Sequence, residues 1–369
     1  MGHGKFEKPR TPRETSGEQT VKRKTAAQRE EATGKSKTNK ILLRIMIVVL
    51  SILLVLLLVV AFVMNYVLGK IGRYDPDADY TGSGVEEFET DPTVEGQETV
   101  DPDDVVWDEV DEMAAEEHII NILLIGNDAR PGETRARSDT MILVSLNKQT
   151  NDVQLTSFMR DLYVQIPGYQ DNRINASYAL GGPELLDDTL KTNFGVQVDG
   201  NVSVNFEAFT EIIDILGGVE IELDSEEAKY MNTYADGTYS AGKIHLDGES
   251  ALVYARMRHV SGGDYTRTER QRNVITAVMQ SLKSASIGDV INLINKVLPY
   301  VTTDLTDGEI IEYATLGLNA LASGGDMSSI RIPQDDAHYA ATIREMSVLV
   351  PDLKMCQEDL REFIYNNEG

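Results

Sequence analysis

An uncharged apolar run at residues 45–64 constrains this chain more than any other feature. The run has 20 residues, and Ser51 is its single polar member. A helix of that length is about 30 Å long, which matches the hydrocarbon core of a bilayer. A cleaved signal peptide would have a shorter apolar region followed by small residues, whereas Asn65 and Tyr66 follow here. We therefore predict a transmembrane anchor over residues 45–68.

The charges before this run indicate the orientation of the chain. Residues 1–44 carry 12 Lys and Arg against 5 Asp and Glu, and they are predicted to form a disordered basic tail. Because positively charged flanks stay in the cytoplasm, we expect a cytoplasmic N-terminus, a single pass through the cell membrane and an extracellular C-terminal part. The formal net charge of the whole chain is -26, which argues against nucleic-acid binding.

An acidic segment follows the predicted anchor. Residues 75–117 include 18 acidic residues and no Lys or Arg. Such a segment repels itself, so residues 69–117 are predicted to be an extended extracellular linker rather than a cation-binding tail. Residues 118–369 are long enough for one mixed domain. The one cysteine, Cys356, excludes an internal disulfide framework and a Cys-rich metal site.

Three consecutive strands are predicted at the start of this domain. Residues 119–125 are an almost continuous apolar run, which is typical of a strand buried on both faces. Residues 140–146 and 153–158 are predicted to be the second and third strands. Their connections are short, so we expect neighbouring antiparallel strands.

Helices and further strands are predicted after these three. Pro183 is expected to open one helix, and residues 206–216 form an amphipathic helix that ends at Gly217. Residues 219–223 are predicted to be a strand, and residues 309–369 to complete the domain with helices and strands. The predicted class is therefore α/β.

The predicted hairpins would bring polar residues to one edge of the sheet. The end of the first strand, the start of the second and the end of the third share that edge. Three acids and three arginines occupy these positions: Asp128, Arg130, Arg137, Asp139, Arg160 and Asp161.

Arginine is concentrated in two windows of the domain. Ten of its 13 arginines lie within residues 130–173, which end at Arg173, or within residues 256–272. The planar guanidinium donates to phosphate and carboxylate oxygens, so the windows indicate an anion site. Salt bridges with the many acids are the structural alternative.

The second window also predicts how its arginines are arranged. Arg256 and Arg258 would project from the same face of an extended segment. Thr266 and Glu269 form a capping-box pattern, which predicts that a helix begins there.

The first turn of this predicted helix carries two cations. Arg267 and Arg270 would oppose the helix dipole, and Gln271 shares a face with Arg267. A bound anion would offset this repulsion. Pairing of the arginines with Glu269 or Asp264 is the alternative.

Acids among arginines predict a magnesium–diphosphate site. Mg²⁺ prefers oxygen ligands and commonly binds one or two carboxylates together with substrate phosphates. We expect Asp128 and Asp139 to bind Mg²⁺ and the arginines to neutralise a diphosphate. Structural ion pairs are again the alternative.

The sequence resembles the LytR-CpsA-Psr family of cell-envelope proteins. The matching motifs are NILLIGNDAR from residue 121, RSDTMILVSL from 137, TSFMRDLYV from 156, RINASYAL from 173, LDGESALVYARMR from 246 and GDYTRTERQ from 263. Met159 replaces the proline usual in this family. The resemblance implies an αβα core with a mixed central sheet and an apolar tunnel for a lipid tail. Phe206, Phe209 and Ile212 suit such a tunnel or an ordinary core.

The resemblance also implies an activity. Such proteins look like Mg²⁺-dependent phosphotransferases that move a glycopolymer, such as teichoic acid or capsule, from a polyprenyl pyrophosphate carrier to peptidoglycan. The candidate site residues form three groups. Asp128 and Asp139 are expected to bind the metal. The expected pyrophosphate contacts are Arg130, Arg137, Arg160, Arg173, Arg256, Arg270 and Gln271. The expected catalytic residues are Arg258, Arg267, Asp264 and Asp161, the two acids being candidates for the general base.

Two other functions are compatible with the same sequence features. A hydrolase would release lipid phosphate at the same site with water as the acceptor. A regulatory envelope protein would bind without turnover, although the basic tail shows no helix-turn-helix pattern and is attracted by acidic lipids in any case.

Overall fold

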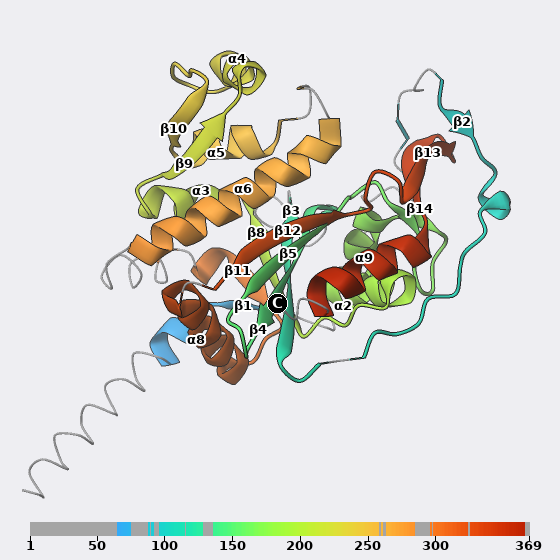
Figure 1. Ribbon diagram of the computed structural model, residues 1–369, viewed down its shortest axis with the longest axis horizontal. Helices are drawn as coiled ribbons and strands as arrows, with labels where there is room; N and C mark the ends of the chain where they lie inside the picture. Colours follow the sequence, from blue (N-terminus) through green and yellow to red (C-terminus); the bar gives the residue numbers. More distant parts are fainter. Residues whose placement is uncertain are drawn as a thin grey trace, which may run out of the picture. The chain divides into compact units, whose positions relative to one another are not determined.

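The computed structural model divides into two compact units, of which the second begins at Val67. The described residues are 65–74, 88, 90–91, 96–114, 116–127, 136–257, 260, 263–284, 296, 298–323 and 325–365 (Figure 1). The predicted tail and most of the predicted anchor lie outside them. Within these ranges no helix is both long and apolar enough to span a membrane.

A mixed sheet forms the centre of the second unit. In the described part of the chain its seven strands are β1 (Gly72–Arg73), β11 (Val301–Thr303), β8 (Gly200–Asn205), β3 (Ile119–Asn127), β4 (Ser138–Asn147), β5 (Val153–Phe158) and β12 (Met327–Ile332), in this spatial order. Strand β3 pairs antiparallel with β4, and β4 with β5. The three predicted strands and their hairpin pairing are therefore confirmed.

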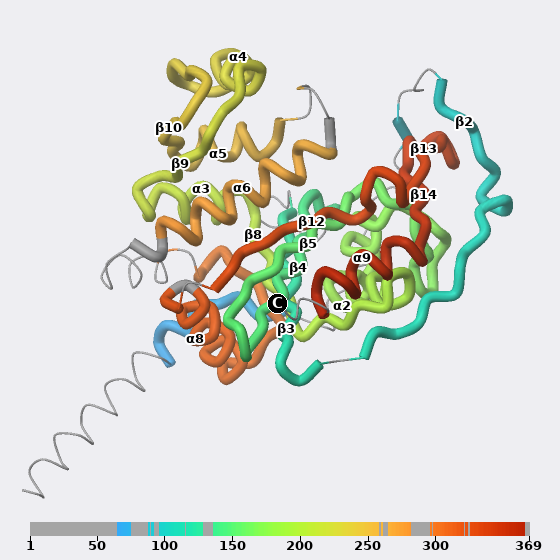
Figure 2. Tube along the Cα trace, viewed as in Figure 1, coloured from blue at the N-terminus to red at the C-terminus, as the bar shows by residue number. Residues whose placement is uncertain are grey.

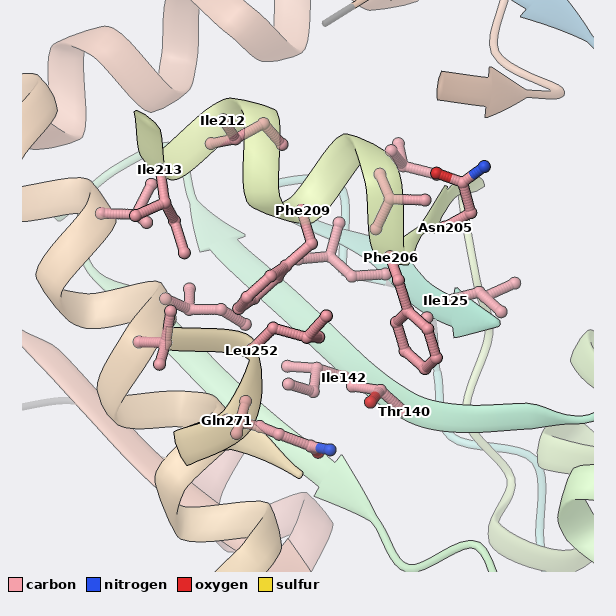
Figure 3. A pocket seen from close by; sticks show the side chains of 18 of the residues that line it. Ile125, Thr140, Ile142, Asn205, Phe206, Phe209, Ile212, Ile213, Leu252 and Gln271 are labelled. Carbon is pink, nitrogen blue, oxygen red and sulfur yellow. The ribbon is translucent and has the colours of Figure 1, made fainter. Parts of the chain in front are cut away.

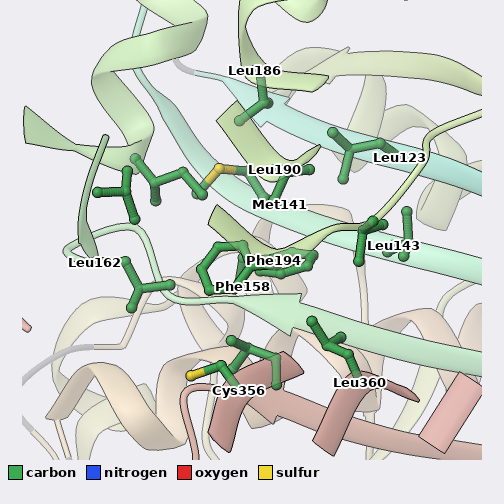
Figure 4. Close-up of a cluster of buried hydrophobic side chains, with 14 of the residues drawn as sticks. Leu123, Met141, Leu143, Phe158, Leu162, Leu186, Leu190, Phe194, Cys356 and Leu360 are labelled. Atoms are coloured by element: carbon green, nitrogen blue, oxygen red, sulfur yellow. The ribbon is translucent and has the colours of Figure 1, made fainter. Parts of the chain in front are cut away.

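The sheet is apolar on both faces because helices cover both. Alternate residues of β3 point to opposite sides: Leu123 belongs to the cluster beneath α2 (Ile174–Phe194) and α9 (Leu353–Tyr365) (Figure 4). Ile122 belongs to the cluster beneath α6 (Gly263–Ser284) and α8 (Asp307–Ser323). The predicted α/β class with a mixed central sheet is confirmed.

Helix α2 is interrupted in the middle. Gly181 and Gly182 have non-helical backbone angles, and the second half of the helix starts with Pro183. The prediction that a helix opens at Pro183 therefore holds for this half. A first half from Ile174 precedes it, which the turn-like Gly-Gly-Pro sequence concealed.

A second apolar cluster lies among the elements that follow β8. These are α3 (Phe206–Ile215), β9 (Val219–Leu223), α4 (Ser225–Tyr234), β10 (Gly242–Leu246) and α5 (Gly248–Ala255), with α6 packed against them (Figure 1). Strand β9 was predicted correctly, but it pairs antiparallel with β10 in a separate two-stranded sheet. Helix α3 ends before Gly217, whose φ of 81° explains the glycine.

Two local predictions around α5 and α6 were wrong. Helix α6 begins at Gly263, so Thr266 lies inside its first turn and is not the N-cap. Arg256 is the C-cap of α5 rather than part of an extended segment. The capping-box pattern misplaced the start of α6 by one turn, as local signals for helix ends often do.

The second half of the predicted linker packs on the domain. Strand β2 (Glu98–Thr99) joins β13 (His338–Ile343), which pairs with β14 (Met346–Pro351). The segment then passes η1 (Pro102–Asp104) and runs along α9 and α2 toward β3 (Figure 2). Trp107 stacks on Tyr163 with ring centroids 5.9 Å apart, and Met113 is buried. Apolar side chains within the acidic run therefore bind it to the surface.

The C-terminal residues complete the domain as predicted. Strand β12 pairs parallel with β5, and α9 packs beside α2. The short strands β6 (Tyr163–Val164) and β7 (Asn172–Arg173) and the turn η2 (Leu298–Tyr300) complete the described elements. Cys356 is buried in the α2–α9 cluster, and burial raises the pKa of its thiol to about 12, so it acts as a core residue.

A buried acid–amide contact joins α2 to the sheet. The side-chain amide of Asn201, in β8, donates to Asp187 and to Asp304, at 2.7 Å in each case. Among the described residues, Asp187 Oδ1 and Asn201 Oδ1 are buried without a hydrogen-bond partner. Burial, reinforced by the nearby Asp304 charge, raises the pKa of Asp187 to about 8. This buried site therefore favours the neutral acid over the carboxylate.

We expect this acid to make stability depend on pH. In the unfolded chain an aspartate has a pKa of about 3.9, so between about pH 4 and pH 8 the folded state holds a proton that the unfolded state has released. The free energy of unfolding should therefore fall as pH rises through this range. Asp187→Asn is neutral at every pH, so the gain in its free energy of unfolding over wild type should be larger at pH 9 than at pH 5, by roughly 4 kcal/mol for a folded-state pKa of about 8. Urea unfolding followed by Trp107 fluorescence measures both; an equal effect at the two pH values would contradict the prediction.

Candidate active site

The strand ends meet at one edge, as the topology predicted. Asp139 is the second residue of β4, and Arg160 follows β5 by two residues. Arg160 Nη1 donates to Asp139 Oδ1 at 2.8 Å. The register of β3 and β4 shifts between Gly126 and Asn127. Such a bulge redirects the chain, and bulges are common beside active sites.

A chain of ion pairs lies behind Asp139. Arg160 Nε is 3.4 Å from Asp161 Oδ2, and Arg173 Nε is 3.6 Å from Asp161 Oδ1. The Arg173 side chain is 5% exposed and also bonds Asp91 and, at 2.7 Å, the Ser347 carbonyl. Arg173 therefore supports Asp161, which in turn supports Arg160.

The remaining residues of this edge are described only in part. Arg137 Nη1 donates to Asn175 Oδ1 at 3.5 Å. The predicted site residues Asp128, Arg130 and Arg258, and the side chain of Asp264, lie outside the described part of the chain.

A polar pocket of about 340 Å³ opens beside Asp139. Its described lining comprises four predicted residues, Asp139, Arg256, Arg267 and Gln271, together with Thr140, Phe206 and Tyr230. Two guanidiniums against one carboxylate leave a net positive charge in this lining. Such a pocket favours an anion.

The two arginines of the pocket are held differently. Arg267 is 3% exposed, and its Nη2 donates to the backbone carbonyl of Asp139 at 3.3 Å. Arg256 is exposed, and its guanidinium lies over the Phe206 ring, 4.3 Å from the centroid. The first is therefore fixed inside the pocket, and the second is positioned at its entrance by a cation–π contact.

Arg270 points elsewhere. Its Nε donates to Glu227 Oε1 at 2.7 Å and its Nη1 to the Met257 carbonyl at 3.4 Å. Both side chains of this ion pair are buried. Neither Arg270 nor Arg173 is among the described residues that line the pocket. Removing one partner of a buried ion pair strongly destabilises the folded protein, because the other charge is left buried and unpaired.

An apolar chamber of about 350 Å³ adjoins the polar pocket. Most of its lining is aliphatic or aromatic, including Ile142, Val202, Phe209, Leu252, Val274 and Val278. Figure 3 shows Gln271 and Thr140 toward one end and Ile212 and Ile213 toward the other. Four residues line both cavities: Thr140, Phe206, Arg256 and Gln271.

The combined cavity suits one class of ligand. Its polar part offers guanidinium and amide donors to an anion, and its apolar part favours hydrocarbon over water. An amphiphile with a phosphate head and a hydrocarbon tail would fill both. The predicted tunnel candidates Phe206, Phe209 and Ile212 all line the chamber.

A divalent cation is compatible with the oxygen donors of this pocket. Asp139 places a carboxylate in the lining, and oxygen is the ligand that Mg²⁺ prefers. Within the described ranges, no group of three or more His, Cys, Asp or Glu converges in a metal-binding arrangement. The second predicted ligand, Asp128, is not among the described residues.

Two pocket residues were not anticipated. Thr140 lies beside Asp139 in sequence, but its hydroxyl carries no charge that would mark it as part of an anion site. Tyr230 reaches the pocket from α4, far in sequence from either arginine window. Only the packing of α4 against α6 could reveal Tyr230.

Comparisons with known proteins agree on one family. A family model described as the LytR_cpsA_psr family matches residues 86–362. The polyisoprenyl-teichoic acid–peptidoglycan teichoic acid transferase TagU of Bacillus anthracis is 34% identical over 239 residues, which are 63% of this chain and 74% of the relative. The transferase of the same name from Oceanobacillus iheyensis is 36% identical over 208 residues, 53% of this chain and 62% of the relative. A solved structure, TagT bound to LI-WTA, is similar with a TM-score of 0.56 and 25% identity, covering 67% of this chain and 91% of that one.

Proposed function

The chain belongs to the LytR-CpsA-Psr family, and from this membership we propose that it transfers a glycopolymer from a polyprenyl pyrophosphate carrier to peptidoglycan. The curated relatives are named teichoic acid transferases, so the proposed donor glycopolymer is teichoic acid or a similar anionic chain. The protein is then an enzyme of cell-wall assembly.

One observation carries this proposal: the polar pocket and the apolar chamber share four lining residues. A polyprenyl pyrophosphate has a doubly phosphorylated head and a long hydrocarbon tail. The head suits Arg256 and Arg267, and the tail suits the chamber. A water-soluble phosphate has no hydrocarbon part that could fill an apolar chamber next to the anion-binding residues.

The proposed reaction is a phosphoryl transfer. A peptidoglycan hydroxyl attacks the phosphorus that carries the glycan; a new P–O bond forms, the P–O bond to the lipid phosphate breaks, and lipid phosphate leaves. Such reactions depend mainly on positioning and charge neutralisation. Arg267 and Arg256 are placed to neutralise the phosphoryl oxygens, and Gln271 to donate its amide.

The acids of the site then have separate roles. Asp139 lines the pocket and would bind Mg²⁺ together with Asp128. The ion would neutralise charge on the pyrophosphate when bound. Asp161 is engaged by Arg160 and Arg173, so it acts as a positioning residue rather than as the base. Asp264 stays a candidate for the base, and Arg258 a candidate contact.

We expect Asp139→Asn to weaken the dependence on the metal. The amide keeps the size of the side chain but loses the charge that attracts a cation and pairs with Arg160. The Mg²⁺ concentration for half-maximal transfer should rise on the order of tenfold. Titration of Mg²⁺ into the transfer assay measures this, with Asp335→Asn, on an exposed side chain, as the control. An unchanged Mg²⁺ curve would remove Asp139 from the metal site.

We propose, as a separate point, that the apolar run at residues 45–64 anchors the chain in the cell membrane with the catalytic domain outside. The polyprenyl carrier is itself a membrane lipid, so an anchor keeps enzyme and substrate in the same layer. Protease accessibility of the C-terminal domain in intact cells tests this orientation.

The full-length protein in detergent micelles, supplied with Mg²⁺, lipid-linked glycan and peptidoglycan fragments, tests the function. Glycan joined to peptidoglycan supports the transferase. Free glycan phosphate would indicate the hydrolase, and unchanged lipid would indicate a binding or regulatory protein.

A further inference from the structure

One tyrosine of α4 lines the polar pocket, a second contacts its ring, and neither has a part in the phosphate chemistry described above. Tyr230 lines the pocket beside Arg256 and Arg267. Tyr234 follows one helical turn later, and the two ring centroids are 4.4 Å apart with an interplanar angle of 37°. Tyr234 is 61% exposed, so aromatic surface continues from the pocket wall to solvent.

A buried ion pair sets the position of these rings. Glu227, in the first turn of α4, accepts from Arg270 Nε at 2.7 Å and from the backbone N–H of Asp224 at 3.0 Å. Arg270 lies on α6 three residues after Arg267. The start of α4 is thereby fixed to the helix that carries the pocket arginine, and Tyr230 follows Glu227 by about one turn.

Helix stability alone does not account for an exposed ring at residue 234. An aromatic pair at positions i and i+4 stabilises a helix only slightly. The exposed ring leaves apolar surface in water, next to a pocket whose other entrance residue, Arg256, is also held over an aromatic ring. The entrance therefore has aromatic surface on two elements, α3 and α4.

A sugar ring has the chemistry that such a surface binds. One face of a pyranose presents C–H groups that pack on an aromatic ring, and its hydroxyl edge stays hydrated. With the lipid tail in the chamber and the diphosphate at Arg256 and Arg267, the glycan has to leave through the pocket entrance. We propose that Tyr230 and Tyr234 form a sugar-binding platform for the donor glycan next to its phosphate. This assignment rests on the proposed function.

The test separates sugar binding from lipid binding. The full-length protein is titrated with a polyprenyl pyrophosphate that has no sugar and with the same lipid carrying a disaccharide. We expect wild type to bind the sugar-bearing lipid more tightly, and Tyr234→Ala to weaken only this form, by about 2- to 10-fold. Tyr234→Phe keeps the ring and should bind both lipids as wild type does. Tyr339→Ala removes an exposed tyrosine of β13 and is the matched control.

Three outcomes would overturn the assignment. Tyr234→Ala could weaken both lipids equally, or neither. Tyr234→Ala could also leave the affinity for the sugar-bearing lipid unchanged and raise only the KM for peptidoglycan fragments. That result would assign the platform to the acceptor sugar. A wild-type protein that binds neither lipid would instead overturn the proposed function, and the two failures are thus distinguishable.

Discussion

Arg267→Ala is expected to lower kcat/KM for glycopolymer transfer by about 100- to 1,000-fold, the loss typical of removing one preorganised donor that stabilises a transition state. The guanidinium is 3% exposed and lies in the polar pocket. Its hydrogen bond to the Asp139 carbonyl fixes it before substrate arrives. It can therefore neutralise a phosphoryl oxygen without reorganisation. Transfer of labelled glycan to peptidoglycan fragments measures the effect.

Two further variants make this result interpretable. Arg267→Lys keeps the charge but loses the planar fork of donors, so it should recover only part of the activity. Arg361→Ala, on the exposed side of α9, should behave as wild type. Thermal unfolding of each variant distinguishes a catalytic loss from a folding loss. If Arg267→Ala is folded and keeps transfer within threefold of wild type, Arg267 does not contact the reacting phosphate.

Val278→Trp is expected to weaken binding of a long-chain lipid substrate by about 50-fold. The indole would occupy space in the apolar chamber that the tail needs; if it excludes three methylene groups, the loss is about 2.4 kcal/mol. The ligand-free protein should be as stable as wild type or more so, because the added ring buries apolar surface. Affinity and stability thus change in opposite directions.

A short-chain substrate provides the internal control for this variant. A prenyl pyrophosphate whose tail ends before the chamber should bind Val278→Trp and wild type equally. Leu318→Trp adds the same ring at an exposed position of α8 and should change neither affinity nor stability. Equal loss for short and long tails would mean that the tail lies elsewhere.

Three neighbouring strands of the central sheet, β3, β4 and β5, could be predicted from the sequence. The run at β3 is apolar almost throughout, β4 has an apolar centre, β5 alternates apolar and polar residues, and their short connections favour antiparallel pairing. The packing of residues 96–114 could not be predicted in the same way. Their acidic composition conceals Trp107 and Met113, whose burial depends on distant partners such as Tyr163.

The site was predictable to the extent that topology determines it. The meeting of Asp139 and Arg160 follows from two hairpins, and the shared face of Arg267 and Gln271 follows from helical spacing. Arg173 and Arg270 lie in the same two arginine windows as the other predicted contacts, yet each guanidinium is buried and paired with an acid. Which arginine of a cluster faces a cavity is decided by packing between α4, α6 and the sheet, and local sequence does not encode it.

Helix α6 supplies side chains to both parts of the cavity, Arg267 and Gln271 to the polar part and Val274 and Val278 to the apolar part. The distance between the side chains proposed to bind the lipid head and those proposed to bind its tail is therefore set by residue spacing along one helix. Inserting a single residue between Gln271 and Val274 would rotate everything after it by about 100° and advance it by about 1.5 Å. We expect such an insertion to misalign the polar pocket and the apolar chamber even though every side chain is retained. Insertions in the loops around the cavity would leave the spacing along α6 intact.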